Sequence, residues 1–298
     1  MTELLTALVR TGRFTPTQPY QRFAYACAAL LLVSAVFHGG VYLVDGGPWE
    51  GPVSWRKPIV FGLSFTVTVA TLAWFLTFLH PRKVTGWTVV VLLAVTSVGE
   101  VFLISMQKWR GVASHFNEDT TFDALVFSAM GLLVTVIALV TVFITVRSFV
   151  RIDAPASLRL AIRAGLVLML VSQAVGGQMI AEGGNTIGAA GALKVPHAVT
   201  LHAAQVLPAL ALLLLMARFP ERHRVRTVGL GTVGYACLIA STMVQTYSGR
   251  GALDPGVGAT VLALSGLAIL AAAAVIAVRG IIALSRTSER EALRSGSL

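Results

Sequence analysis

Long runs of apolar residues alternate along the chain with short polar segments. Eight runs are long enough to cross a hydrocarbon core of about 30 Å as helices, which takes roughly 20 residues each. They cover about residues 22–44, 58–79, 85–106, 122–146, 160–181, 198–217, 226–246 and 258–283. Because little chain is left for a soluble domain, the pattern predicts an all-α polytopic membrane protein with eight transmembrane helices.

The composition supports this fold class. Hydrophobic residues make up 56% of the chain and charged residues 12%, whereas a soluble domain has roughly 25% charged residues. The first 21 residues contain no apolar core of the kind that a cleavable signal peptide needs, so we expect the first span to act as the insertion signal.

The net charge of +10 is sorted by segment. Most of the 23 basic residues lie in the segments before the first, third, fifth and seventh spans and after the eighth. By the positive-inside rule, both termini are predicted to be cytoplasmic. The basic residues therefore indicate topology, and no nucleic acid is expected as a partner.

One phrase occurs twice. The sequence GGVYLVDGG at residues 39–47 returns as GGQMIAEGG at residues 176–184, each time at the end of an outward-going span. We interpret this as a duplication of four spans, which gives two parallel four-helix repeats. Chance repetition of glycine pairs is the alternative. The predicted parts are a cytoplasmic segment 1–21, repeats 22–157 and 158–285, and a cytoplasmic tail 286–298.

Polar side chains within the spans gather at one predicted depth. Ionisable groups in a membrane are costly and usually functional. The polar residues near the outer ends of the spans are His38, Glu100, Gln173, Gln178, His197, His202, Gln205 and Gln245. The sequence therefore predicts a buried polar site that opens to the extracytoplasmic side.

The histidines suggest metal or haem chemistry, because imidazole is a common metal ligand. His197 and His202 are five residues apart and point about 140° from each other on a regular helix. We therefore predict His38 and His202 as the ligand pair for haem or a transition metal ion. The predicted catalytic residues are Glu100 as proton acceptor or ligand, His197 in a gating role, and Glu182. Hydrogen-bonded packing residues are the alternative.

The outer loops offer further candidates, since loops commonly carry function. The predicted substrate-binding residues are Trp55, Arg56, Lys57, Trp109, Arg110, Lys194 and Gln205. They would bind an anionic, lipophilic or quinone-like small molecule. As alternatives, the basic residues snorkel to the interface, the tryptophans form an aromatic belt, and residues 119–123 cap a helix.

The segments WEGPVSWRKPIVFGLSF, QKWRGVASHFNEDTTFD and LKVPHAVTLHAAQVLP resemble those of a family of multi-pass bacterial membrane proteins. The resemblance implies a bacterial cytoplasmic membrane location and no particular activity. The architecture is also similar in shape to haem A synthase, but this chain lacks that family's paired histidines in both halves and its outer cysteine pair.

Nucleotide chemistry is not expected, because the chain has no P-loop and no dinucleotide fingerprint. Three hypotheses follow. The first is a haem- or metal-binding membrane oxidoreductase acting on a lipophilic or quinone-like substrate. The second is a transporter or proton-coupled channel that uses the same site. The third is a non-catalytic sensor or a subunit of a complex.

Overall fold

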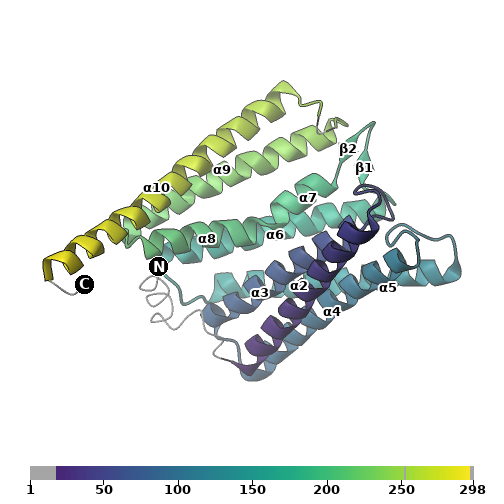
Figure 1. Ribbon diagram of the computed structural model, residues 1–298, viewed down its shortest axis with the longest axis horizontal. Coiled ribbons are helices and arrows are strands. Elements are labelled where there is room, and N and C mark those ends of the chain that lie inside the picture. The colour runs from purple at the N-terminus through teal and green to yellow at the C-terminus, as the bar shows by residue number, and fades with distance from the viewer. Residues whose placement is uncertain (1–17, 252, 296–298) are drawn as a thin grey trace. The chain divides into compact units, whose positions relative to one another are not determined.

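The computed structural model describes residues 18–251 and 253–295 (Figure 1). Nearly all of them are helical. In chain order the elements are α2 (Pro19–Asp45), α3 (Arg56–Leu79), α4 (Lys83–Trp109), α5 (Thr121–Val150), α6 (Ala156–Ala181), β1 (Thr186–Ile187), β2 (Gly191–Ala192), α7 (Lys194–Leu201), α8 (Ala203–Met216), α9 (Glu221–Tyr247) and α10 (Val257–Ser295).

Within these described residues, eight helical stretches are long and apolar enough to cross a membrane, with α7 and α8 together forming one of them. The predicted number of long apolar helices is therefore confirmed, and their ends differ by a few residues. The short antiparallel hairpin β1–β2 was not predicted. Of the predicted terminal segments, residues 1–17 and 296–298 lie outside the described part of the chain.

The helices divide into two compact units. The α2–α5 unit also includes residues 180–184, and the α6–α10 unit contains the rest of α6, the hairpin and the helices that follow. The proposed duplication and the orientation of the termini remain predictions.

In the α2–α5 unit, α3 packs against α2 and α4, and α4 packs against α5. Leu72, Phe75 and Phe78 of α3 are almost completely buried. A Cβ atom at Gly62 of α3 would lie 2.9 Å from the Cβ of Ala35 in α2. Small residues at such crossings let membrane helices approach closely, which favours their association where lipid gives no hydrophobic driving force.

In the α6–α10 unit, α9 contacts α7, α8 and α10. A Cβ atom at Gly165 of α6 would lie 2.7 Å from the Cα of Ala204 in α8. The crossing of α6 and α8 is therefore as close as that of α2 and α3, and both depend on a glycine at the contact.

Large apolar side chains also cover much of the outside of both units. Val33 is 64% exposed, Leu132 66% and Leu264 63%. Extensive exposed apolar surface is unusual for a soluble monomer, and it is what lipid-facing helices present.

The sixth span is broken. The sequence predicted one continuous helix over 198–217, but α7 ends at Leu201 and α8 begins at Ala203, with His202 as the turn between them. The Tyr235 hydroxyl of α9 donates to the Val199 carbonyl at 2.6 Å. Side chains of neighbouring helices commonly satisfy backbone groups where a membrane helix is interrupted.

Candidate functional site

Glu100 on α4 is the least compensated acidic group in the described part of the α2–α5 unit. Its exposure is 0%, and neither carboxylate oxygen has a hydrogen-bond partner among the described residues. The cationic or potentially cationic group beside it is His115, whose Nε2 lies 3.7 Å from Glu100 Oε1. Burial of a carboxylate without hydrogen bonds is costly, so this residue is the strongest candidate for a functional group.

One helical turn after Glu100, α4 contributes to an apolar cluster. Ile104, Val126 and Met130 form a buried cluster at this end of α4 and α5, with Phe61 packed against it. Phe61 also lies beside the His115 ring, with 5.5 Å between ring centroids. The glutamate and the histidine thus lie close to apolar side chains that offer no hydrogen bonds.

His115 comes from the loop between α4 and α5, which folds back over Glu100. Its Nδ1 is 2.9 Å from Ser114 Oγ, and Ser114 Oγ accepts a hydrogen bond from Lys57 Nζ at 3.4 Å. Because the serine oxygen accepts from the lysine, its hydroxyl proton is available for His115 Nδ1. This arrangement leaves the proton of the neutral imidazole on Nε2, toward Glu100.

Burial, and secondarily the positive charge of Lys57, lower the pKa of His115 to about 3. Both effects disfavour the imidazolium form. His115 is therefore neutral near neutral pH in this conformation.

Asn117 braces the same loop. Its side chain is 4% exposed, donates from Nδ2 to the Ala113 carbonyl at 3.0 Å, and accepts from the Asp119 amide at 3.1 Å. Phe116, between His115 and Asn117, has a φ of 55°, a left-handed conformation that non-glycine residues seldom adopt. These local contacts hold His115 in place.

A second cluster in the α2–α5 unit is aromatic. Trp109 Nε1 donates to His38 Nε2 at 3.1 Å, and His38 Nδ1 donates to the Ser34 carbonyl at 2.8 Å. Trp55 is buried, with its ring centroid 5.0 Å from that of Trp109 and Lys108 Nζ 4.1 Å above the ring. Both ring nitrogens of His38 are thus hydrogen-bonded, and a metal ion could bind there only if one bond broke.

The charge of Arg110 is neutralised within the α2–α5 unit. Arg110 pairs with Asp123 at 2.5 Å, donates to Gln107, and lies 4.6 Å over the Phe122 ring. The Asp123 amide donates to Thr120 Oγ1 at 3.1 Å, which is the helix cap considered as an alternative for this segment. This network stabilises the start of α5 and leaves Arg110 compensated.

The two basic residues at the start of α3 differ in their partners. Arg56 pairs with Glu50 at 3.1 Å and donates to the Trp49 carbonyl at 3.2 Å, whereas Lys57 reaches toward Ser114 and His115. Of these two predicted substrate-binding residues, Lys57 is the one that the structure brings close to His115.

The remaining predicted residues belong to the α6–α10 unit or the turn that follows α6. His197 Nδ1 is 2.9 Å from the Ser172 carbonyl, and the Ser172 hydroxyl donates to the His197 carbonyl at 2.8 Å. His202 Nδ1 lies 3.3 Å from Gln205 Oε1. Lys194 and Glu182 are exposed.

Two buried polar atoms flank the break at His202. Thr200 Oγ1 and Gln205 Nε2 are shielded from solvent and have no hydrogen-bond partner in the described structure. Discontinuous helices with available polar groups form substrate and ion sites in many transporters. The break is therefore a second candidate site, made by one helix pair of the α6–α10 unit.

The predicted ligand pair is divided between the units. His38 belongs to the α2–α5 unit and His202 to the α6–α10 unit, so their pairing remains a prediction. Among the residues that the structure describes, no three His, Cys, Asp or Glu side chains gather as a metal ion would require.

Sequence reasoning singled out Glu100 but missed the roles of Ser114, His115 and Asn117. All three residues lie in the loop that was predicted to be on the outer side. A loop histidine three residues from an acidic stretch adds nothing to the periodic pattern of apolar residues. A buried carboxylate such as Glu100 calls for a titratable neighbour, and that requirement could have pointed to His115.

In comparisons with known proteins, no family model, no curated protein and no solved structure matched this chain.

Proposed function

We propose that the protein is a proton-coupled membrane carrier in which Glu100 binds the transported proton. The observation that carries the proposal is the complete burial of Glu100 without a hydrogen bond to either oxygen in the described structure. A carboxyl group in such surroundings is least costly when it is protonated and uncharged. Ionisable residues of this kind are typical of proton relays in pumps and transporters.

His115 is the group that would exchange protons with Glu100. Its Nε2 lies 3.7 Å from the carboxylate, slightly beyond hydrogen-bond distance, so a small movement of the loop or a single water molecule would complete the connection. Ser114 and Lys57 continue the chain of polar atoms away from the buried carboxyl.

The broken α7–α8 span favours a carrier over a channel. Thr200 Oγ1 and Gln205 Nε2 are buried polar groups with hydrogen-bonding capacity that described residues leave unused, and they lie on either side of the break. In the proposed function, these groups bind a small polar substrate whose movement is coupled to protonation of Glu100.

Proton flux through liposomes tests the proposal. The purified protein is reconstituted with a pH-sensitive dye inside, and a potassium diffusion potential drives proton entry. We expect Glu100→Gln to reduce the flux by about 10²-fold, the lower end of what one positioned proton-transfer group contributes. Glu118→Gln, which neutralises an exposed carboxylate in the same unit, is the matched control and should leave the flux unchanged.

Infrared spectroscopy provides a readout independent of transport. The wild-type protein should show a protonated carboxyl band at neutral pH that is absent in Glu100→Gln and retained in Glu118→Gln. Equal flux and an equal carboxyl band in all three proteins would refute the proposal.

A further inference from the structure

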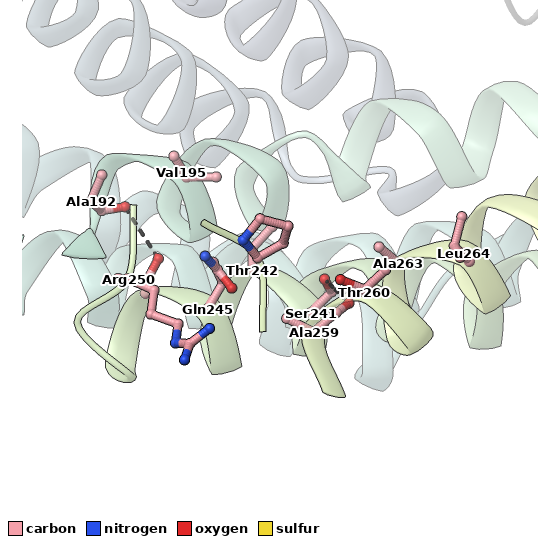
Figure 2. A pocket seen from close by; sticks show the side chains of 12 residues that line it. Ala192, Val195, Ser241, Thr242, Gln245, Arg250, Ala259, Thr260, Ala263 and Leu264 are labelled. Carbon is pink, nitrogen blue, oxygen red and sulfur yellow. Dashed lines mark hydrogen bonds between the residues drawn. The ribbon is translucent and has the colours of Figure 1, made fainter. Parts of the chain in front are cut away.

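The α6–α10 unit contains a groove between α7, α9 and α10, shown in Figure 2. Its volume is about 330 Å³. Arg250 lies at one end, and Ala263 and Leu264 of α10 lie at the other. The groove therefore runs from the connection between α9 and α10 into the membrane-spanning length of both helices.

The walls of the groove are apolar, although several hydroxyl-bearing residues line it. The Ser241 hydroxyl donates to the Ala259 carbonyl at 2.6 Å. Thr242 donates to the Ile239 carbonyl at 2.8 Å, and Thr260 donates to the Gly256 carbonyl at 3.0 Å. Because these donors are satisfied by backbone, the side chains present mostly methyl and methylene groups to a ligand.

Gln245 at the same end as Arg250 is likewise committed to the protein. Its Nε2 donates to the carbonyls of Gly251 and Asp254 at 2.7 and 2.8 Å, and its Oε1 accepts from the Gly256 amide at 3.0 Å. Both amide protons are therefore used, so Gln245 shapes the groove and offers a ligand no donor.

Arg250 is the charged residue of the groove lining. Its side chain is 47% exposed, and its Nη1 lies 3.6 Å from the carboxylate of Asp254, which is 73% exposed. Exposed ion pairs of this kind contribute little, so an anion with better geometry can displace the aspartate. The guanidinium fork matches phosphate oxygens in a two-pronged arrangement.

We infer that this groove binds an anionic phospholipid, with the phosphate at Arg250 and one acyl chain along α9 and α10. From Val257 to Leu264 the helix rises about 10 Å, which accommodates much of an acyl chain. Leu264 is 63% exposed and Val261 58%, so the apolar part of the groove is continuous with the lipid-facing surface. An ionic end and an apolar body in one groove fit an amphiphile better than a soluble anion.

Native mass spectrometry of the delipidated full-length protein tests the inference. Phosphatidylglycerol and phosphatidylcholine with identical acyl chains are added separately. We expect the wild-type protein to prefer phosphatidylglycerol, because the choline cation of phosphatidylcholine offsets its phosphate charge and is repelled by Arg250. Arg250→Gln should weaken the binding of phosphatidylglycerol by about tenfold, the effect of losing one charge-assisted contact.

Two further variants separate the headgroup from the chain. Arg222→Gln removes an exposed charge from the opposite end of α9 and should leave the preference intact. Ala263→Phe fills the apolar part of the groove and should weaken both lipids. The inference is overturned if Arg222→Gln acts as strongly as Arg250→Gln, if Arg250→Gln has no effect, or if Ala263→Phe leaves both lipids bound as before.

Discussion

Replacing Lys57 with glutamine should raise the pKa of His115. The lysine ammonium lies 3.4 Å from Ser114 Oγ, which is itself 2.9 Å from His115 Nδ1. The charge is therefore at most about 6 Å from His115 Nδ1. Two unit charges at that distance interact by about 3 kcal/mol at an effective dielectric constant of 20 and by about 0.7 kcal/mol in water.

Since about 1.4 kcal/mol corresponds to one pH unit, the loss of this charge should raise the pKa of His115 by roughly 0.5 to 2 pH units. The increase should be incomplete, because burial is the larger cause of the lowered value and the variant leaves burial unchanged. His115 should therefore still titrate below the ordinary histidine value of about 6.5.

The assay is an NMR titration of the protein in detergent micelles with labelled histidine, in which His115→Gln assigns the resonance. Arg56→Gln is the matched control, because it removes a neighbouring charge that is paired with Glu50. An unchanged or lower pKa in Lys57→Gln, or an equal rise in Arg56→Gln, would refute the electrostatic reasoning.

The lowered pKa also sets the pH dependence of folding. The unfolded chain protonates His115 near pH 6.5, whereas the folded protein does so only near pH 3. The contribution of His115 to stability is therefore fully present above about pH 6.5 and decreases as the pH falls toward 3. Thermal unfolding in detergent should show this loss on acidification, and His115→Gln should reduce it; an identical pH dependence in both proteins would contradict the assignment.

Two substitutions test the packing. Trp109→Phe removes the donor to His38 and should lower the free energy of unfolding by about 1 kcal/mol; unchanged thermal stability would show that this bond contributes nothing. Gly165→Leu places atoms within 2.7 Å of the α8 backbone and should destabilise the protein by about 1–3 kcal/mol, whereas Gly177→Leu, where a Cβ meets nothing within 4 Å, should not. Equal unfolding temperatures for the two glycine variants would exclude close helix crossing as the reason for the small residue.

The eight spans could be predicted because hydrocarbon leaves the backbone few alternatives to a helix, and length and apolarity then suffice. The break at His202 could not, because it depends on contacts between elements distant in sequence, such as the bond from Tyr235 to Val199. Likewise, the two-residue strands β1 and β2 are too short to produce an alternating pattern.

Part of the candidate site could also be predicted from the sequence. Glu100 stands out in an apolar run, because the cost of burying a charge is a property of the residue and its surroundings. Its contact with His115 depends on how the 110–120 loop folds, and that fold is fixed by Asn117 and by a left-handed Phe116. Arg110 looked available for a substrate, since the sequence alone does not reveal that Asp123 neutralises it.

The lack of hydrogen bonds to the Glu100 carboxyl group affects how freely that group can rotate. No described residue donates a hydrogen bond to either oxygen, and His115 Nε2 is 3.7 Å from Oε1, so no donor at hydrogen-bond distance fixes the torsion of the carboxyl group. A proton that arrives on one oxygen can therefore be turned to face another direction by a side-chain rotation. In this way one residue can present the same proton to two different neighbours in succession.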